Sequence, residues 1–260
     1  MKIAILGGGN LGQSIAQGLL ENKVSPETIT ITRNKTELLR NLQQQGVHVS
    51  NNNNEATKKA DLIIIAVKPY KIAEILQDIK SEITTKKILV SVVSDFSIQQ
   101  IEENLSTKPT IIRAMPNTAS AVNESITCIA SNNASTEDLK IVTSIFKSLG
   151  ETVEINETLM DAATVLGACG IAYVLRFIRS MIQGGIEIGF DAQTATKIAT
   201  QAVKGASELL LQKENHPEAE IDKVTTPKGC TIAGLNEMEH QGFSSALIKG
   251  IKTSFDNISN

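Results

Sequence analysis

The chain has 260 residues, enough for one large domain or two moderate ones, and its 41% hydrophobic and 20% charged residues are typical of a soluble globular protein. A formal net charge of -3 without a basic cluster, together with only 3% aromatic residues, argues against a nucleic-acid-binding protein. Cys128, Cys169 and Cys230 have neither the spacing of metal ligands nor that of a disulfide framework. We therefore expect a cytoplasmic protein with no metal site, and with apolar runs too short to span a membrane.

The first part of the chain alternates β-type runs with helical periodicity. Buried strands are expected at 3–6, 29–32, 62–67, 88–93 and 110–113, and helices at 13–21, 36–45, 72–79 and 98–105. A further strand, helix and strand at 125–130, 136–149 and 152–155 could extend the same sheet. This alternation predicts βαβ units with right-handed crossovers, and so an α/β domain with a parallel sheet over residues 1–156.

The character of the sequence changes after residue 156, where strand signals end. Long Ala-rich helices are expected at 159–188 and 192–211, broken by the Gly184-Gly185 pair and by a turn at 189–191. Two further helices are expected at 231–241 and 244–257. We predict a second, all-helical domain over residues 157–260. Its helices are apolar around much of their circumference, which favours a helix-mediated dimer over a simple monomeric core.

A glycine pattern stands where the first strand becomes a helix. Gly7, Gly9 and Gly12 form G-x-G-x-x-G, with Asn10 and Leu11 inside it. In this arrangement the glycines allow a tight turn, a close approach to a pyrophosphate and close helix packing, while the helix N-terminus supplies N–H groups. The alternative is a purely structural turn. Because strand, loop, helix and second strand follow in the correct order, we predict a dinucleotide site.

The residues at the end of the second strand indicate which dinucleotide is bound. An NAD site usually has Asp or Glu there, which accepts hydrogen bonds from ribose hydroxyls. This chain has Thr32-Arg33-Asn34 instead. A guanidinium can hold a 2′-phosphate that a carboxylate would repel, so the sequence predicts NADPH in preference to NADH. The alternative is that Arg33 is a solvated surface charge.

Five motifs in register make the interpretation more specific. They are Ala66-Val-Lys-Pro69, Arg113-Ala-Met-Pro-Asn-Thr118, Gly170-Ile-Ala-Tyr173, Thr226-Pro-Lys-Gly-Cys-Thr-Ile-Ala-Gly-Leu235 and Gly234-Leu-Asn-Glu-Met-Glu-His-Gln-Gly-Phe243. In this order the chain resembles pyrroline-5-carboxylate reductases over essentially its whole length. The resemblance implies an N-terminal Rossmann domain, a helical dimerisation domain, and NAD(P)H-dependent reduction of 1-pyrroline-5-carboxylate to L-proline. It also implies self-association as dimers or as rings of five dimers.

The resemblance further implies which residues form the site. Those that bind the cofactor are Gly7, Gly9, Asn10, Leu11, Gly12, Arg33, Asn34, Asn53, Ala66, Val67, Lys68, Pro69, Val92 and Ser94. Asn54 competes with Asn53 for one of these positions, and the nicotinamide is expected near 92–94. The substrate carboxylate is expected at Gly229, Cys230 and Thr231, and Glu214 is expected to face the ring nitrogen, often across a subunit boundary.

The chemistry of these residues agrees with that reaction. The turn at 229–231 opens a helix and offers unpaired N–H groups to a carboxylate. Thr231 can also hydrogen-bond the ring nitrogen and deliver a proton, or simply cap its own helix. Glu214 can stabilise an iminium charge, or be a solvated glutamate in a charged stretch. We expect Thr231 and Glu214 to be the catalytic residues.

Three positions depart from the pattern of the family. Ile171 replaces a usual proline, Lys228 a usual glycine and Cys230 a usual threonine or alanine. Lys228 must therefore avoid a positive φ or bear its cost. Two rival functions remain, a β-hydroxyacid dehydrogenase-like oxidoreductase and a cofactor-sensing protein without turnover. The first expects a lysine within 167–178, where this chain has only Arg176.

Overall fold

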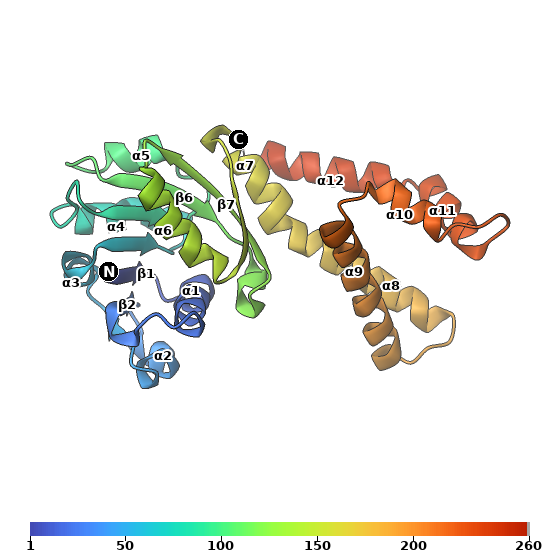
Figure 1. Cartoon of the computed structure of the whole chain (residues 1–260), viewed down its shortest axis with the longest axis horizontal. Helices are drawn as coiled ribbons and strands as arrows, with labels where there is room; N and C mark the ends of the chain where they lie inside the picture. Colours follow the sequence, from blue (N-terminus) through green and yellow to red (C-terminus); the bar gives the residue numbers. More distant parts are fainter. Residues whose placement is uncertain (259–260) are drawn as a thin grey trace. The chain divides into compact units, whose positions relative to one another are not determined.

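The structure is a computed structural model that describes residues 1–258. It divides into two compact units, residues 1–169 together with Ile258, and residues 170–257. Figure 1 shows the first unit as a sheet covered by helices and the second as helices alone. The predicted fold class is confirmed, whereas the domain boundary at 156/157 stays a prediction.

The first unit is built on an eight-stranded sheet of order β3-β2-β1-β4-β5-β6-β7-β8. The chain moves outward from β1 to β3 and then returns to the other side of β1 with β4. Such a reversal opens a crevice at the carboxyl ends of the central strands, where dinucleotides bind. All neighbouring strands are parallel except β6 and β7. The strands are β1 (Ile3–Leu6), β2 (Ile29–Thr32), β3 (His48–Ser50), β4 (Leu62–Ile65), β5 (Ile88–Ser91), β6 (Thr110–Met115), β7 (Ser125–Asn132) and β8 (Gly150–Glu154).

Helices cover both faces of this sheet (Figure 1), and the strand residues alternate between the two cores. Ile3 and Ile5 pack on one face with apolar residues of α1 and α6, whereas Ala4 and Leu6 pack on the other with α4 and α5. Burial on both faces explains why these strands are continuously hydrophobic. The helices of this unit are α1 (Asn10–Glu21), α2 (Arg40–Gln44), α3 (Asn53–Lys59), α4 (Ile72–Ile79), α5 (Ile98–Glu103), α6 (Thr136–Lys147) and α7 (Met160–Ala163).

Most predicted elements of the first unit are present, with differences at their ends. The expected extension of the sheet is confirmed as β7, α6 and β8. The short strand β3 was missed, because its three residues His48–Ser50 are too few to show an alternating pattern. The segment expected as one helix at 36–45 is a 3-10 turn, Thr36–Leu39, followed by the short helix α2.

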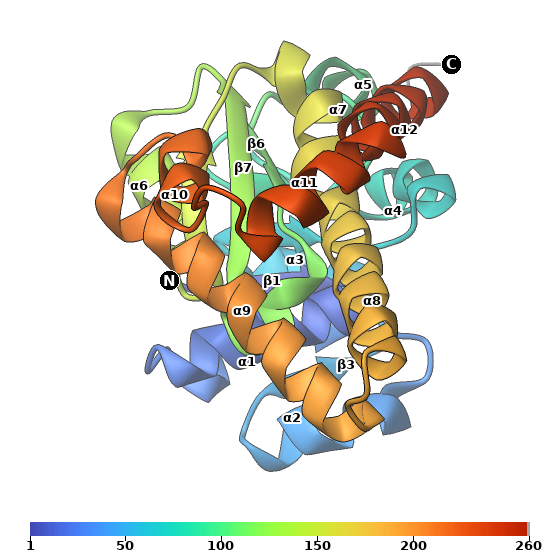
Figure 2. The same cartoon turned by 90° about the vertical axis from the view of Figure 1, so that its right-hand side faces the viewer.

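The second unit consists of α8 (Gly170–Glu187), α9 (Ala192–Lys213), α10 (Pro217–Lys223), α11 (Cys230–His240) and α12 (Phe243–Ile258). Figure 2 shows α8 and α9 as a hairpin joined by the turn near Gly189. The prediction that Gly184-Gly185 breaks the helix is wrong, since α8 continues to Glu187. Instead, Gly185 allows a close approach to α9, because a Cβ there would lie 3.1 Å from the Cβ of Ala195. The hydroxyl of Tyr173 donates to Ser254 Oγ at 2.6 Å and so links α8 to α12.

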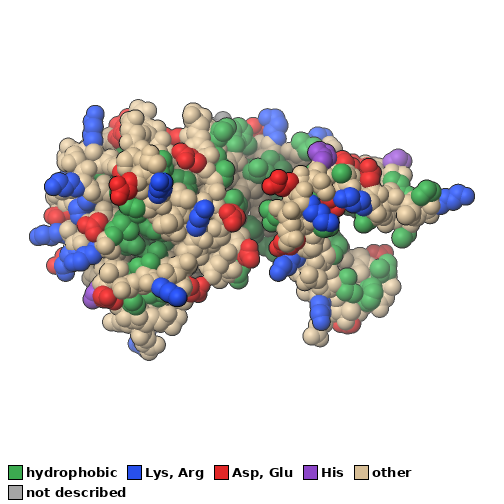
Figure 3. Space-filling model, viewed as in Figure 1, with side chains coloured by type: hydrophobic (Ala, Val, Ile, Leu, Met, Phe, Trp, Pro, Cys, Tyr) green, Lys and Arg blue, Asp and Glu red, His purple; other side chains and the backbone are tan. Residues whose placement is uncertain are grey.

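This helical unit leaves much apolar surface uncovered. Only Ala195 and Ala199 are buried among residues 170–257. Apolar side chains lie on the surface of the α8–α9 hairpin in Figure 3. Large exposed ones occur on α8, α9, α11 and α12 and in the turn between α8 and α9. They include Leu175, Ile186, Ile188, Phe190, Ile198, Leu211, Leu247 and Ile248. A surface of this kind is typical of an interface.

One continuous helical stretch corrects the expectation about apolar runs. Residues Glu157–Glu187 pass through α7, a π-helical turn at Thr164–Cys169 and α8. It contains an 18-residue window with a mean hydropathy of 1.6, so by length and composition alone this stretch is long and apolar enough to cross a membrane. The expectation was based on uninterrupted apolar runs. In this stretch polar residues interrupt the apolar ones, although the helical segment as a whole is apolar.

Candidate functional site

The passage from β1 into α1 has no room for a Cβ at Gly7 or at Gly12, where backbone carbonyl oxygens lie too close. Gly7 has φ +112°, and a Cβ there would collide with the carbonyl oxygen of Ala66 at the end of β4. A Cβ at Gly12 would collide with the carbonyl oxygen of Gly7, so this glycine brings α1 against the loop. Gly9 has nothing within 4 Å of its Cβ position and precedes α1 without a side-chain cap. The first N–H groups of α1 are therefore free to bind an anion.

The end of β2 is tied to this loop by hydrogen bonds. The N–H of Gly8 donates to the carbonyl of Thr32 at 2.7 Å, and Arg33 Nη1 donates to the carbonyl of Gly8 at 2.7 Å. Thr32 Oγ1 also donates to Asn53 Oδ1 at 2.6 Å, which connects β2 to the start of α3. Arg33 is half-buried and bonded to the loop, rather than a freely solvated charge. Its role in cofactor choice stays a prediction.

A cavity of about 400 Å³ lies at this edge of the sheet. It has four cationic side chains and no carboxylate among its lining residues, which favours an anionic ligand. The lining residues are Gly7, Gly8, Gly9, Thr32, Arg33, Asn34, Lys35, Asn51, Asn53, Ala66, Val67, Lys68, Tyr70, Lys71 and Ile75.

The cavity brings together eight of the residues predicted to bind the cofactor: Gly7, Gly9, Arg33, Asn34, Asn53, Ala66, Val67 and Lys68. It does not include Asn10, Leu11, Gly12, Pro69, Val92 or Ser94. The first three of these lie in α1 directly behind the glycine loop, and Pro69 begins a 3-10 turn after Lys68. The sequence reasoning missed Tyr70 and Lys71, which follow the Val-Lys-Pro motif and belong to no pattern.

Asn53 and Asn54, the two candidates for one cofactor-binding position, face different parts of the structure. Asn53 begins α3 and lines the cavity. Asn54 instead turns to α4, where its Nδ2 donates to the carbonyl of Asp78 at 3.0 Å. This geometry favours Asn53 as the residue that faces a ligand.

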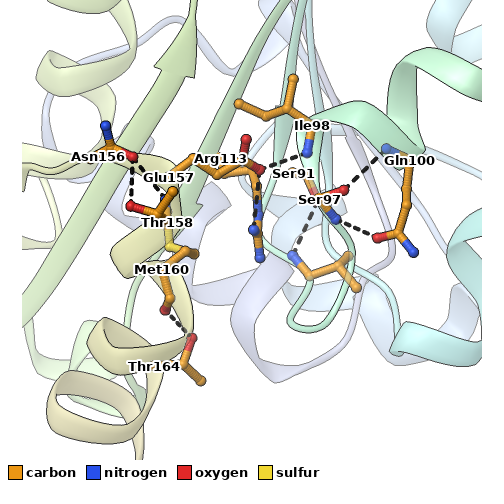
Figure 4. A network of polar contacts seen from close by, with 11 residues as sticks. Ser91, Ser97, Ile98, Gln100, Arg113, Asn156, Glu157, Thr158, Met160 and Thr164 are labelled. Atoms are coloured by element: carbon orange, nitrogen blue, oxygen red, sulfur yellow. Dashed lines mark hydrogen bonds and ion pairs between the residues drawn. The ribbon is translucent and has the colours of Figure 1, made fainter. Parts of the chain in front are cut away.

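Val92 and Ser94 begin the loop between β5 and α5, and a polar network holds the end of that loop (Figure 4). Ser97 and Gln100 form a reciprocal cap at the start of α5. Glu157 Oε1 accepts from the N–H of Ile98 at 2.7 Å and from Arg113 Nη1 at 3.3 Å. The loop is thus anchored to β6 and to the segment before α7.

Arg113 and Glu157 form the most buried ion pair in the described part of the chain. Their side chains are 5% and 20% exposed. Nε and Nη2 of Arg113 are also buried and have no partner among residues 1–258. In the sequence Arg113 stands out only as the last residue of an expected strand and the first of a motif, and no pattern marks Glu157. A charged residue inside the strand expected at 110–113 was the available signal, since buried charges are rare without a partner.

The residues predicted for the substrate lie in the second unit. Gly229 is the N-cap of α11, and Cys230 and Thr231 are its first two residues, both exposed. The side chain of Thr231 makes no capping hydrogen bond, so the structure does not support the alternative that this residue simply caps its own helix. Glu214 ends α9 in the left-handed region with φ 54° and is also exposed. No hydrogen bond joins Glu214 to Thr231 among the described residues.

Lys228 adopts φ +60°, so it bears the cost expected of a side chain in a glycine position. The turn it belongs to is closed by the N–H of Gly229, which donates to the carbonyl of Thr226 at 2.9 Å. A Cβ on Gly229 would lie 2.6 Å from Thr226 Oγ1, so this residue has little room for a side chain. Lys228 therefore lies in a closed turn whose next residue is sterically restricted to glycine.

Comparison with known proteins agrees with this geometry. Pyrroline-5-carboxylate reductase 2 of Dictyostelium discoideum is 41% identical over 99% of this chain and 92% of its own length. The chain belongs to the pyrroline-5-carboxylate reductase family. Pyrroline-5-carboxylate reductase 1 of the same organism is 45% identical over 98% of the chain, which spans about half (48%) of that longer relative. The resemblance recognised from the five motifs is thus confirmed.

Two family models match separate parts of the chain, and a solved structure matches nearly all of it. Residues 2–95 match the family described as NADP oxidoreductase, coenzyme F420-dependent, and residues 157–260 match pyrroline-5-carboxylate reductase dimerisation. A crystal structure of Plasmodium falciparum pyrroline carboxylate reductase with NADP bound superposes with a TM-score of 0.90 at 28% identity, covering 99% of this chain and 97% of the other. The expected self-association through the helical part is confirmed at the level of the family.

Proposed function

We propose that this chain reduces 1-pyrroline-5-carboxylate to L-proline with NADPH as the hydride donor. One observation carries the proposal, namely the cationic cavity that the glycine loop forms at the reversal of strand order. Membership of the reductase family specifies the acceptor, which the cavity alone does not.

The first unit supplies the cofactor half of the site. The free N–H groups at the start of α1 bind the pyrophosphate, and Arg33 and Asn34 bind the 2′-phosphate. NADPH is preferred over NADH because the lining has no carboxylate to accept from a ribose hydroxyl. The loop at Val92 and Ser94 supports the nicotinamide, which when bound supplies the hydride for the imine carbon.

The second unit supplies the substrate half. N–H groups at the start of α11, at Gly229, Cys230 and Thr231, bind the substrate carboxylate. The imine nitrogen is protonated before transfer, and Thr231 orients it by a hydrogen bond and relays that proton to it from solvent, while Glu214 stabilises the positive charge of the iminium. As hydride then adds to the imine carbon, the electron pair of the C=N bond moves to nitrogen and neutralises it. Orientation at near-attack distance is the main source of acceleration.

The exposed substrate residues are completed by a second copy of the chain. The matched dimerisation region begins at Glu157 and includes all of the apolar stretch Glu157–Glu187. We assign this stretch to self-association rather than to a membrane, and the assembly to dimers or a ring of five dimers in the cytoplasm. Burial between copies offsets the apolar surface that one helical unit leaves exposed.

The test is a substrate panel with the purified chain. We expect NADPH oxidation that depends on 1-pyrroline-5-carboxylate and produces proline. Oxidation of a β-hydroxyacid in its place would favour the dehydrogenase-like alternative. Cofactor binding without turnover on either substrate would favour a sensing role and would refute the proposal.

A further inference from the structure

We propose that Lys71 is a specificity-determining residue that binds the 2′-phosphate of NADPH from the β4 side of the cavity. This inference rests on the proposed function, since it concerns the cofactor of the same site. Lys71 ends the 3-10 turn Pro69–Lys71, directly before α4. Arg33 and Asn34 approach the same cavity from the end of β2, on the other side of β1.

Lys71 shares two neighbouring hollows with Asn34, whereas the glycine loop lines only one of them. A second hollow adjoins the cavity and is lined by Asn34, Asn51, Asn52, Asn53, Asn54, Lys71, Glu74, Ile75 and Asp78. Lys71 and Asn34 line both hollows, whereas the glycines line only the first. Because the pyrophosphate belongs at the glycine loop, a ligand group next to Lys71 lies further along the cofactor, at the ribose phosphate.

The charge of Lys71 has no counterion in the described part of the chain. The ammonium forms no ion pair or hydrogen bond with any residue of 1–258, although Glu74 and Asp78 line the second hollow with it. The residue is half-buried, whereas Lys35 and Lys68 of the same cavity are exposed. An ammonium without a counterion on the lining of the cavity is available for a charge-assisted hydrogen bond to an incoming phosphate.

The two carboxylates also limit where a phosphate can lie. Glu74 and Asp78 line only the second hollow, and they repel a phosphate from it. The cavity at the glycine loop instead has four cationic side chains, those of Arg33, Lys35, Lys68 and Lys71. Arg33 already uses Nη1 on the carbonyl of Gly8, so part of its guanidinium is committed to the loop. Lys71 supplies a cation with no partner among residues 1–258 from the turn that follows β4.

The experiment compares the charge-removing variant Lys71→Gln with the charge-retaining Lys71→Arg and with Lys86→Gln. Lys86 is exposed and lines neither hollow, so it controls for the loss of a positive charge elsewhere in the unit. Binding of NADPH and NADH is measured by the fluorescence of the bound dihydronicotinamide. Binding of adenosine 2′,5′-bisphosphate is measured by calorimetry, which isolates the phosphate from the nicotinamide.

We expect Lys71→Gln to raise the Kd for NADPH and for the bisphosphate about tenfold, and to leave the Kd for NADH within about twofold. Lys71→Arg should retain most of the NADPH affinity, and Lys86→Gln should bind both cofactors as the unaltered chain does. Equal weakening of NADPH and NADH, or no change in either, would overturn the assignment of Lys71. An unaltered chain that binds NADPH but does not reduce 1-pyrroline-5-carboxylate would refute the proposed function alone.

Discussion

Removal of the Glu157 carboxylate tests whether the network around Arg113 stabilises the first unit. In Glu157→Ala the N–H of Ile98 loses its acceptor at 2.7 Å, and Arg113 loses its bond at 3.3 Å. The guanidinium, 5% exposed, would then be left without any partner among residues 1–258. Unpaired buried charges are costly, so the variant should unfold more readily.

The magnitude follows from the two contacts. A hydrogen bond to a charged group contributes about 1.5–3 kcal/mol, and the 2.7 Å bond to Ile98 is of this kind. The longer bond to Arg113 contributes less, and the 20% exposure of Glu157 lets water offset part of the loss. We expect a loss of about 3 kcal/mol in the free energy of unfolding, below the upper end of ~3–5 kcal/mol for broken buried pairs. Glu157→Gln keeps an acceptor for Ile98 and should lose about 2 kcal/mol.

Thermal unfolding at a fixed protein concentration measures this effect. A loss of about 3 kcal/mol corresponds to a melting temperature roughly 6–12 °C lower for a chain of this size. Glu124→Ala is the matched control, because Glu124 is an exposed carboxylate of the same unit and should change stability by less than about 0.5 kcal/mol. A Glu157→Ala chain that melts within about 2 °C of the unaltered chain would mean that the ion pair contributes no net stability.

Three further changes probe the glycine loop, the substrate turn and the helical unit. Gly12→Ala should weaken NADPH binding at least about tenfold by pushing α1 away from Gly7; unchanged calorimetric affinity would contradict the packing argument. Thr231→Ala should lower kcat/KM for the imine at least about tenfold, and kinetics like those of the unaltered chain would remove this residue from the chemistry. Hydrogen bonds with Thr194 hold the pKa of Asp191 below its ordinary 3.8, so its stabilisation of α9 is complete above that pH and lost in stronger acid. The melting temperature of Asp191→Ala should therefore differ from that of the unaltered chain at neutral pH and converge with it in acid; a constant difference would contradict the cap.

The fold was predictable because its strong signals are local. The strands at 3–6 and 29–32 and the helix at 72–79 have the predicted bounds, since each has a clear period and clear ends. The antiparallel placement of β7 beside β6 was not predictable, because strand pairing depends on contacts between distant segments. The continuity of α8 through Gly184-Gly185 shows the same limit, since packing on Ala195 outweighs the low helix propensity of glycine.

The candidate site was predictable where backbone geometry or ligand charge requires particular residue types. The glycine loop and the end of β2 were found because helix packing requires glycine and a phosphate favours cations. Tyr70 and Lys71 were missed because a side chain that reaches a cavity from a 3-10 turn has no sequence period. The Arg113–Glu157 pair joins residues 44 positions apart, and nothing in the sequence indicates which carboxylate meets this arginine.

The two halves of the proposed site differ in what holds their residues in place. This difference determines how a substitution in each half affects the protein. The residues of the cofactor half lie at the buried ends of strands, which hydrogen bonds connect. Substitutions there should therefore change the affinity for the cofactor. The substrate half consists of exposed residues on turns, with Lys228 and Glu214 both at positive φ. Strained, exposed positions persist only when their surroundings constrain them. Since the helical unit buries so little of itself, we propose that self-association supplies that constraint; kcat/KM should then fall on dilution at protein concentrations where the Kd for NADPH is still unchanged.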